Sequence, residues 1–179
     1  MDDDLTRLAE LVKRRNALEC EITEIIARPA SIGHIGEFIA ARIFNISLEH
    51  SATAKGIDGR FNDGLLKGRS VNVKWYALRE GLLDITPDFL PDYYLVLAGP
   101  RAPLMTSRGR TRPWTIDSVY IFNTSTLINQ LNARGVKLGI ACSVANSFWA
   151  NAEVHPNQTS VELTLSPEQR QQLLLFGAR

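Results

Sequence analysis

The sequence has 179 residues with 45% hydrophobic and 22% charged content, enough for a packed core, which excludes disordered, collagen-like and low-complexity classes. Two distant cysteines exclude a disulfide scaffold and a cysteine-rich zinc module, and the acidic start and short apolar runs predict a soluble, cytoplasmic protein with no membrane partner. The net charge of +1 excludes no partner, but residues 55–115 hold ten basic and six acidic side chains, so positive charge gathers mid-chain.

The first predicted element is a long amphipathic helix over residues 2–28, which we expect to be a helical extension. Its apolar side chains recur at three- and four-residue steps, and charged side chains fill the other faces. One interpretation is a helix packed on its own domain, and the other is a helix that pairs with a second copy in a homodimer. The stripe consists of Leu5, Leu8, Val12, Leu18, Ile22 and Ile25.

Residues 29–179 interleave helices and strands without a linker or a repeat, which indicates one domain. A second helix is predicted over residues 31–45 with Ser31 as its N-cap. Strands are predicted over 56–61, 70–76, 93–98, 118–122, 136–144 and 161–165, and helices over 124–134 and 167–176. We therefore expect the α/β (α+β) class, with a mixed central β-sheet flanked by helices.

The strand over 70–76 has a clear alternation. Val71, Val73 and Trp75 should face one side of the sheet, and Asn72, Lys74 and Tyr76 the other. The turn sequence at residues 62–64 predicts a hairpin between this strand and the one before it.

Glu37, Asp58 and Lys74 are the candidate catalytic residues. In a hairpin, Asp58 and Lys74 can converge at one sheet edge, and the preceding helix can bring Glu37 alongside. Carboxylates bind Mg²⁺ or Mn²⁺ and a lysine holds phosphate, which is the equipment for phosphodiester hydrolysis. Each residue also has an ordinary interpretation, as a turn aspartate, a solvated strand lysine and an exposed helix glutamate.

The order of these residues resembles the PD-(D/E)XK nuclease superfamily, which has the restriction-endonuclease-like fold. The resemblance covers residues 31–98, and Arg-Pro-x-x-x-Gly-x-x-Gly-Glu, from Arg28 to Glu37, is similar to a segment of uncharacterised bacterial members. It implies a restriction-endonuclease-like core, Mg²⁺-dependent or Mn²⁺-dependent cleavage of nucleic acid, and often a homodimer. Asp58 corresponds to the first acidic position, Lys74 to the lysine and Glu37 to the helical glutamate.

Asn72 departs from the family pattern, which has Asp or Glu two residues before the lysine. The resemblance then implies a metal site of Asp58, Asn72 and Glu37, in which the amide offers one neutral oxygen and lowers the affinity for metal. The available substitute carboxylates are Asp63, Glu80 and Asp84. We therefore expect a nuclease-like protein, weakened or inactive through Asn72; the alternative is an inactive nucleic-acid-binding or structural homodimer.

A basic loop over residues 101–114 is the second candidate feature. Its arginines could bind backbone phosphates, with DNA as the expected nucleic acid, and Trp114 could stack on a base. The other interpretation is a solvated loop. The candidate nucleic-acid-binding residues are Arg108, Arg110 and Arg112, together with Lys55 and Arg60 from the same basic part of the chain.

Overall fold

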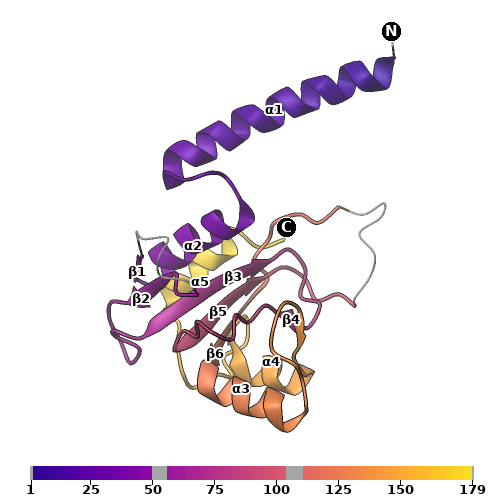
Figure 1. Cartoon of the computed structure of the whole chain (residues 1–179). Coiled ribbons are helices and arrows are strands. Elements are labelled where there is room, and N and C mark those ends of the chain that lie inside the picture. The colour runs from indigo at the N-terminus through magenta and orange to yellow at the C-terminus, as the bar shows by residue number, and fades with distance from the viewer. Residues whose placement is uncertain (1, 50–55, 104–110, 179) are drawn as a thin grey trace.

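The computed structural model describes residues 2–49, 56–103 and 111–178 (Figure 1). These residues form a mixed six-stranded sheet with helices on both faces, which confirms the expected α+β class. The sheet comprises β1 (Ile46–Leu48), β2 (Gly59–Phe61), β3 (Ser70–Tyr76), β5 (Tyr93–Ala98), β6 (Ser118–Asn123) and β8 (Glu153–His155), in the spatial order β1-β2-β3-β5-β6-β8. The restriction-endonuclease-like identity of this core stays a prediction.

β3 is the strand around which the candidate site is built. It pairs in parallel with β5 from Val71 to Tyr76, while the other pairs in this sheet are antiparallel. β2 pairs with β3 only at Gly59 opposite Val71 and Arg60 opposite Ser70. The hairpin prediction is therefore confirmed, and from Val73 onward the outer edge of β3 has no strand partner among the described residues.

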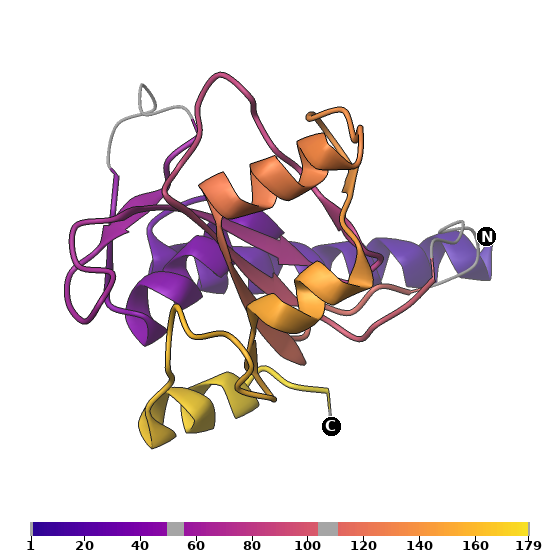
Figure 2. The same ribbon diagram turned by 90° about the horizontal axis from the view of Figure 1, so that it is seen from below.

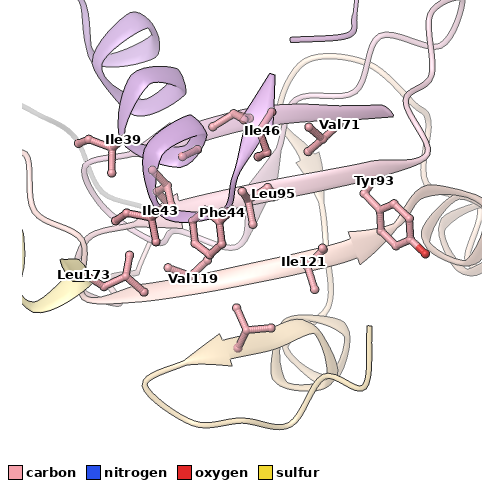
Figure 3. Close-up of a cluster of buried hydrophobic side chains, with 14 of the residues drawn as sticks. Ile39, Ile43, Phe44, Ile46, Val71, Tyr93, Leu95, Val119, Ile121 and Leu173 are labelled. Carbon is pink, nitrogen blue, oxygen red and sulfur yellow. The ribbon is translucent and has the colours of Figure 1, made fainter. Parts of the chain in front are cut away.

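Each face of the sheet has its own hydrophobic core. On one face Val71, Val73 and Trp75 pack with α2 (Ile32–Ile43) and α5 (Pro167–Leu174). Figure 3 shows Val71 and Leu95 in this core with Ile43 of α2 and Leu173 of α5. On the other face, α3 (Thr124–Ala133) and α4 (Asn146–Ala152) cover the core that Tyr76 joins (Figure 2). The alternation predicted for β3 is confirmed.

α1 (Asp3–Ile26) projects away from the sheet (Figure 1). Asp2 caps its first turn, and Ile26 is its only buried residue. Near its C-terminal end, Ile22 and Ile25 line an apolar pocket together with residues of α2 and α5. Leu8 and Leu18 are 55% and 58% exposed. The interpretation that α1 packs on its own domain is therefore wrong for most of the helix.

Several boundaries differ from the sequence-based expectation, and the strand predicted over 56–61 begins only at Gly59 in β2. The helix predicted to residue 45 ends at Ile43, because Asn45 adopts a left-handed backbone conformation with φ of 52° before β1 begins. The strand predicted over 136–144 is reduced to β7 (Cys142–Ser143), which pairs with β4 (Leu82–Leu83). Ala141, inside this run, has a positive φ of 56°, which interrupts an extended strand.

The strand predicted over 161–165 is wrong, and α4 and β8 were not predicted. Here the carbonyl oxygen of Leu163 accepts from the Gln158 side chain at 2.9 Å, and Val161 is exposed. Side-chain bonds therefore occupy backbone groups that a sheet would need. In the part of the chain that the structure describes, no helix is long and apolar enough to cross a membrane.

Candidate functional site

Asp58 lies where β2 leaves β3. Its backbone N–H donates to the Val71 carbonyl oxygen at 2.9 Å, and its carboxylate Oδ2 accepts from the Val73 N–H at 2.7 Å. The carboxylate thus accepts the Val73 N–H at the edge of β3, where a backbone carbonyl oxygen would accept it if β2 extended further toward its N-terminal side. The short pairing of β2 with β3 is what gives the side chain this place.

The environment of Asp58 is partly buried and crowded with charge. Burial raises the pKa of Asp58 from 3.8 to about 6. The Val73 N–H and the charges of Lys74 and Arg28 lower this pKa, and the charge of Glu37 raises it further. The charges of Glu37 and Lys74 thus act on Asp58, so the three residues that the sequence predicts to converge form one electrostatic cluster.

Glu37 reaches this cluster because α2 packs closely on β3. Gly36 makes that approach possible: a Cβ atom there would lie 3.0 Å from Cβ of Trp75. The Glu37 carboxylate accepts a hydrogen bond from Nη1 of Arg28, in an ion pair where 16% of the Glu37 side chain is exposed. Sequence reasoning did not assign Arg28 a role, although it opens the Arg-Pro-x-x-x-Gly-x-x-Gly-Glu segment that ends at Glu37.

Asn72 lies buried on the same strand, with 6% of its surface exposed. Its Nδ2 donates to the Gly56 carbonyl oxygen at 3.2 Å. Its Oδ1 is buried and has no hydrogen-bond partner among the described residues. A buried oxygen without a partner is costly, and it suits a water molecule or a hard cation.

The oxygen atoms of this cluster are of the kind that binds a divalent cation, but the cluster has little net negative charge to attract one. Glu37 and Asp58 supply two carboxylates and Asn72 supplies one neutral oxygen. Arg28 and Lys74 offset both carboxylate charges, so these five side chains sum to zero. Within residues 2–49, 56–103 and 111–178, no group of three or more His, Cys, Asp or Glu side chains could hold a metal ion.

None of the three substitute carboxylates joins this site. Asp63 accepts from Nδ2 of Asn45 at 2.7 Å, and Asp84 accepts from the Ala141 N–H at 2.7 Å. Glu80 forms an ion pair with Arg112. Each of these carboxylates is therefore held by another partner in the described part of the chain.

The predicted nucleic-acid-binding residues are only partly described. Lys55, Arg108 and Arg110 lie outside the described residues. Arg60 lies 3.7 Å from a Glu49 carboxylate oxygen and donates to the Gly68 carbonyl oxygen at 3.2 Å. Arg60 therefore already has partners in the free protein.

The end of the basic loop is anchored to the fold. Arg112 donates to both carboxylate oxygens of Glu80, at 3.1 and 3.3 Å. Trp114, predicted to stack on a base, lies against Trp75 with ring centroids 6.2 Å apart and is 48% exposed. Nε1 of Trp75 also donates to the Thr115 carbonyl oxygen at 3.0 Å.

In comparisons with known proteins, no family model matches this chain and no curated protein matches it.

Proposed function

We propose that this protein is a metal-dependent nuclease-like hydrolase of phosphodiester bonds, with DNA as its substrate and with activity weakened by Asn72. The observation that carries the proposal is the cluster at the open edge of β3. There the Asp58 carboxylate interacts with the charges of Glu37 and Lys74, beside the unpartnered buried oxygen of Asn72.

Each side chain then has a defined task. Asp58, Glu37 and the Asn72 oxygen would hold Mg²⁺ or Mn²⁺, which supplies charge stabilisation at the phosphate when it is bound. Lys74 binds the negatively charged phosphate of the substrate. Arg28 fixes the orientation of Glu37 through their ion pair.

A nucleic-acid-binding protein without turnover is the second candidate. The neutral charge sum of the cluster favours it, because a divalent cation gains little from a site whose two carboxylates are already offset. Both candidates bind nucleic acid, and they differ in metal binding and cleavage.

We also propose that α1 pairs with α1 of a second copy. The supporting observation is that most of its apolar stripe lies outside the core, with Leu5 and Ile25 at 64% and 69% exposure. A nuclease that cuts both strands of a duplex benefits from two copies related by a two-fold axis.

The test of the nuclease proposal compares the natural protein with Asn72→Asp and Lys74→Met. Asn72→Asp should raise the affinity for Mn²⁺ by about tenfold, measured by calorimetric titration, because the carboxylate adds a charge where the amide has only a dipole. Lys74→Met should keep Mn²⁺ binding and lose plasmid nicking. Asn132→Asp, an exposed change on α3, is the matched control.

The results separate the candidates. Mn²⁺-dependent nicking by the natural protein, abolished in Lys74→Met, supports the nuclease. Nicking that appears only in Asn72→Asp supports the protein without turnover. Mn²⁺ affinity that is the same in Asn72→Asp and Asn132→Asp would show that Asn72 does not belong to a metal site.

A further inference from the structure

Arg79, in the segment after β3, is buried without a carboxylate partner. It is 8% exposed, its Nη1 is buried without a hydrogen-bond partner, and no ion pair among the described residues includes it. The segments 50–55 and 104–110, outside the description, contain neither Asp nor Glu. A buried guanidinium without an acceptor is costly, so its retention needs a physical reason.

Two aromatic rings provide part of that reason. The guanidinium carbon lies 5.4 Å from the ring centroid of Trp149 and 5.7 Å from that of Tyr120. The two rings meet edge to face at 4.8 Å. Such contacts stabilise the charge, but they leave its N–H groups without oxygen acceptors.

Arg79 also forms part of the wall of a cavity of about 450 Å³. The cavity lies between residues 79–81, which follow β3, residues 101–103, which follow β5, and Asn146 at the start of α4. This volume is in the range of small-molecule sites. The residue that carries the buried cation therefore borders a space that a ligand can occupy.

A second arginine lines the same cavity. Arg79 and Arg101 are paired in a parallel bridge, with the Arg79 N–H donating to the Pro100 carbonyl oxygen at 3.0 Å. The Ala102 N–H donates back to the Arg79 carbonyl oxygen at 3.2 Å. Paired backbone segments thus fix two cationic residues beside one cavity, and Arg101 is exposed at its mouth.

The carboxylates near the cavity are already engaged. Glu80, on the wall, is held by Arg112 in a two-point ion pair. Glu153, which interacts electrostatically with Tyr120, accepts from Nδ2 of Asn157 at 2.8 Å. The remaining positive charge of the cavity comes from Arg79 and Arg101.

We propose that this cavity binds a phosphate group through Arg79 and Arg101. The planar, multiply donating guanidinium matches the oxygens of a phosphate, which would supply both the missing acceptor and the missing negative charge. The phosphate can belong to a small molecule or to a nucleic-acid backbone. The site is separate from the metal cluster, and the proposal does not depend on cleavage.

The experiment titrates inorganic phosphate into the full chain by calorimetry in a phosphate-free buffer. Saturable binding is expected, weakened by roughly tenfold in Arg101→Ala and lost in Arg79→Lys, because a lysine lacks the forked donors. Arg134→Ala is the matched control, since Arg134 is an exposed arginine stacked 5.8 Å from the Phe148 ring of α4. Arg101→Ala keeps the test decisive even if Arg79→Lys fails to fold, because Arg101 is exposed.

A second arm uses a fluorescent single-stranded oligonucleotide in an anisotropy titration. Weaker oligonucleotide binding in Arg101→Ala than in Arg134→Ala assigns the site to a nucleic-acid backbone. Weaker binding of inorganic phosphate alone assigns it to a small-molecule phosphate. If both probes bind Arg101→Ala as they bind Arg134→Ala, the proposal is overturned and Arg79 serves the packing of Tyr120 and Trp149. Metal binding and nicking are measured separately, so this failure would leave the nuclease proposal standing.

Discussion

At the scale of the residue, Asp58 has two tasks that oppose each other. Its Oδ2 completes the hydrogen bonding of the Val73 N–H at the edge of β3, and in the proposed metal site its charge would attract the cation. Burial disfavours that charge, which is why the pKa is raised to about 6. The protonated form, which does not bind metal, therefore predominates below about pH 6 rather than below 3.8.

Asp58→Asn should stabilise the protein at pH 7.5 and have little effect at pH 4. The native pKa of about 6 exceeds the ordinary 3.8, so the native state holds the proton more tightly. Its contribution to stability is complete below pH 3.8 and is lost as pH rises to about 6. The gain at pH 7.5 has an upper bound of roughly 3 kcal/mol, and the amide oxygen can still accept from Val73.

Urea denaturation of the natural protein and Asp58→Asn at the two pH values measures this difference. Asp88→Asn, an exposed change of the same chemistry, is the control. Equal stabilisation by Asp58→Asn at pH 4 and pH 7.5 would contradict the raised pKa. Metal affinity of the natural protein should also fall as pH drops through about 6, because the carboxylate becomes protonated.

At the scale of the element, the sequence predicted strands whose pattern is local. β3 has its predicted bounds because its alternating residues match the two faces of a sheet. The helix predicted to start at residue 167 likewise begins at Pro167, and Ser166 forms a capping box with Gln169 there. These signals depend on neighbours along the chain, so no tertiary knowledge was needed.

The contacts that define the site are different in kind. The Arg28–Glu37 ion pair and the unpartnered oxygen of Asn72 depend on how α2 approaches β3 and on where β2 ends. A sequence gives the order of Glu37, Asp58 and Lys74, but it does not give these approaches. The burial of Arg79 could not be predicted either, because its aromatic partners come from β6 and α4.

Gly36→Ala tests the approach of α2 to β3. The added Cβ would meet Trp75 at 3.0 Å, so helix or strand must shift, at a cost of roughly 1 to 3 kcal/mol. Gly33→Ala is the matched control in the same helix, where the nearest atom would be 4.0 Å away, and it should be neutral or stabilising by up to about 1 kcal/mol. Thermal denaturation measures both, and equal melting temperatures would contradict this packing.

Leu8→Glu combined with Leu18→Glu tests the pairing of α1. Both side chains are exposed, at 55% and 58%, so the change should spare the fold and remove apolar contact with a second copy. The natural protein should scatter light as a dimer of 19.9 kDa chains, and this variant as a monomer. A natural protein that is monomeric at every concentration would reject the pairing.

Ala17→Glu combined with Cys20→Glu is the control for that experiment. Both positions are exposed, and at 100° per residue they lie about 140° to 160° around the helix from the middle of the apolar stripe. They add the same charge to the opposite face. The control should remain dimeric, which separates loss of the apolar stripe from a general charge effect.

At the scale of the whole molecule, the parallel pairing of β3 and β5 brings Lys74 and the basic loop over residues 101–114 to one end of the sheet. Segments that follow parallel strands leave the sheet at the same edge, and Lys74 lies in the second half of β3. The Arg112–Glu80 ion pair and the Trp75–Trp114 contact then anchor the end of the basic loop beside β3. A nucleic acid held by this loop would therefore lie near the carboxylate cluster.

Arg108→Ala combined with Arg110→Ala tests that path, and Arg112 stays in place because its ion pair anchors the segment. If both arginines contact backbone phosphates, affinity for duplex DNA should fall, and the slope of log K against log salt should flatten by up to about 1.8, or 0.9 per contact. The control, Arg7→Ala with Arg14→Ala, removes the same charge from exposed positions on α1.

Fluorescence anisotropy at several salt concentrations gives the slopes. A long-range charge effect would lower the affinity of both double variants alike and would vanish as salt rises, since screening acts over about 10 Å at 0.1 M salt. Direct contact would flatten the slope only for the loop variant. Identical slopes in the natural protein and in the loop variant would leave Arg108 and Arg110 without a role in binding. Lys74 and Arg101 would then be the remaining candidates for contact with DNA.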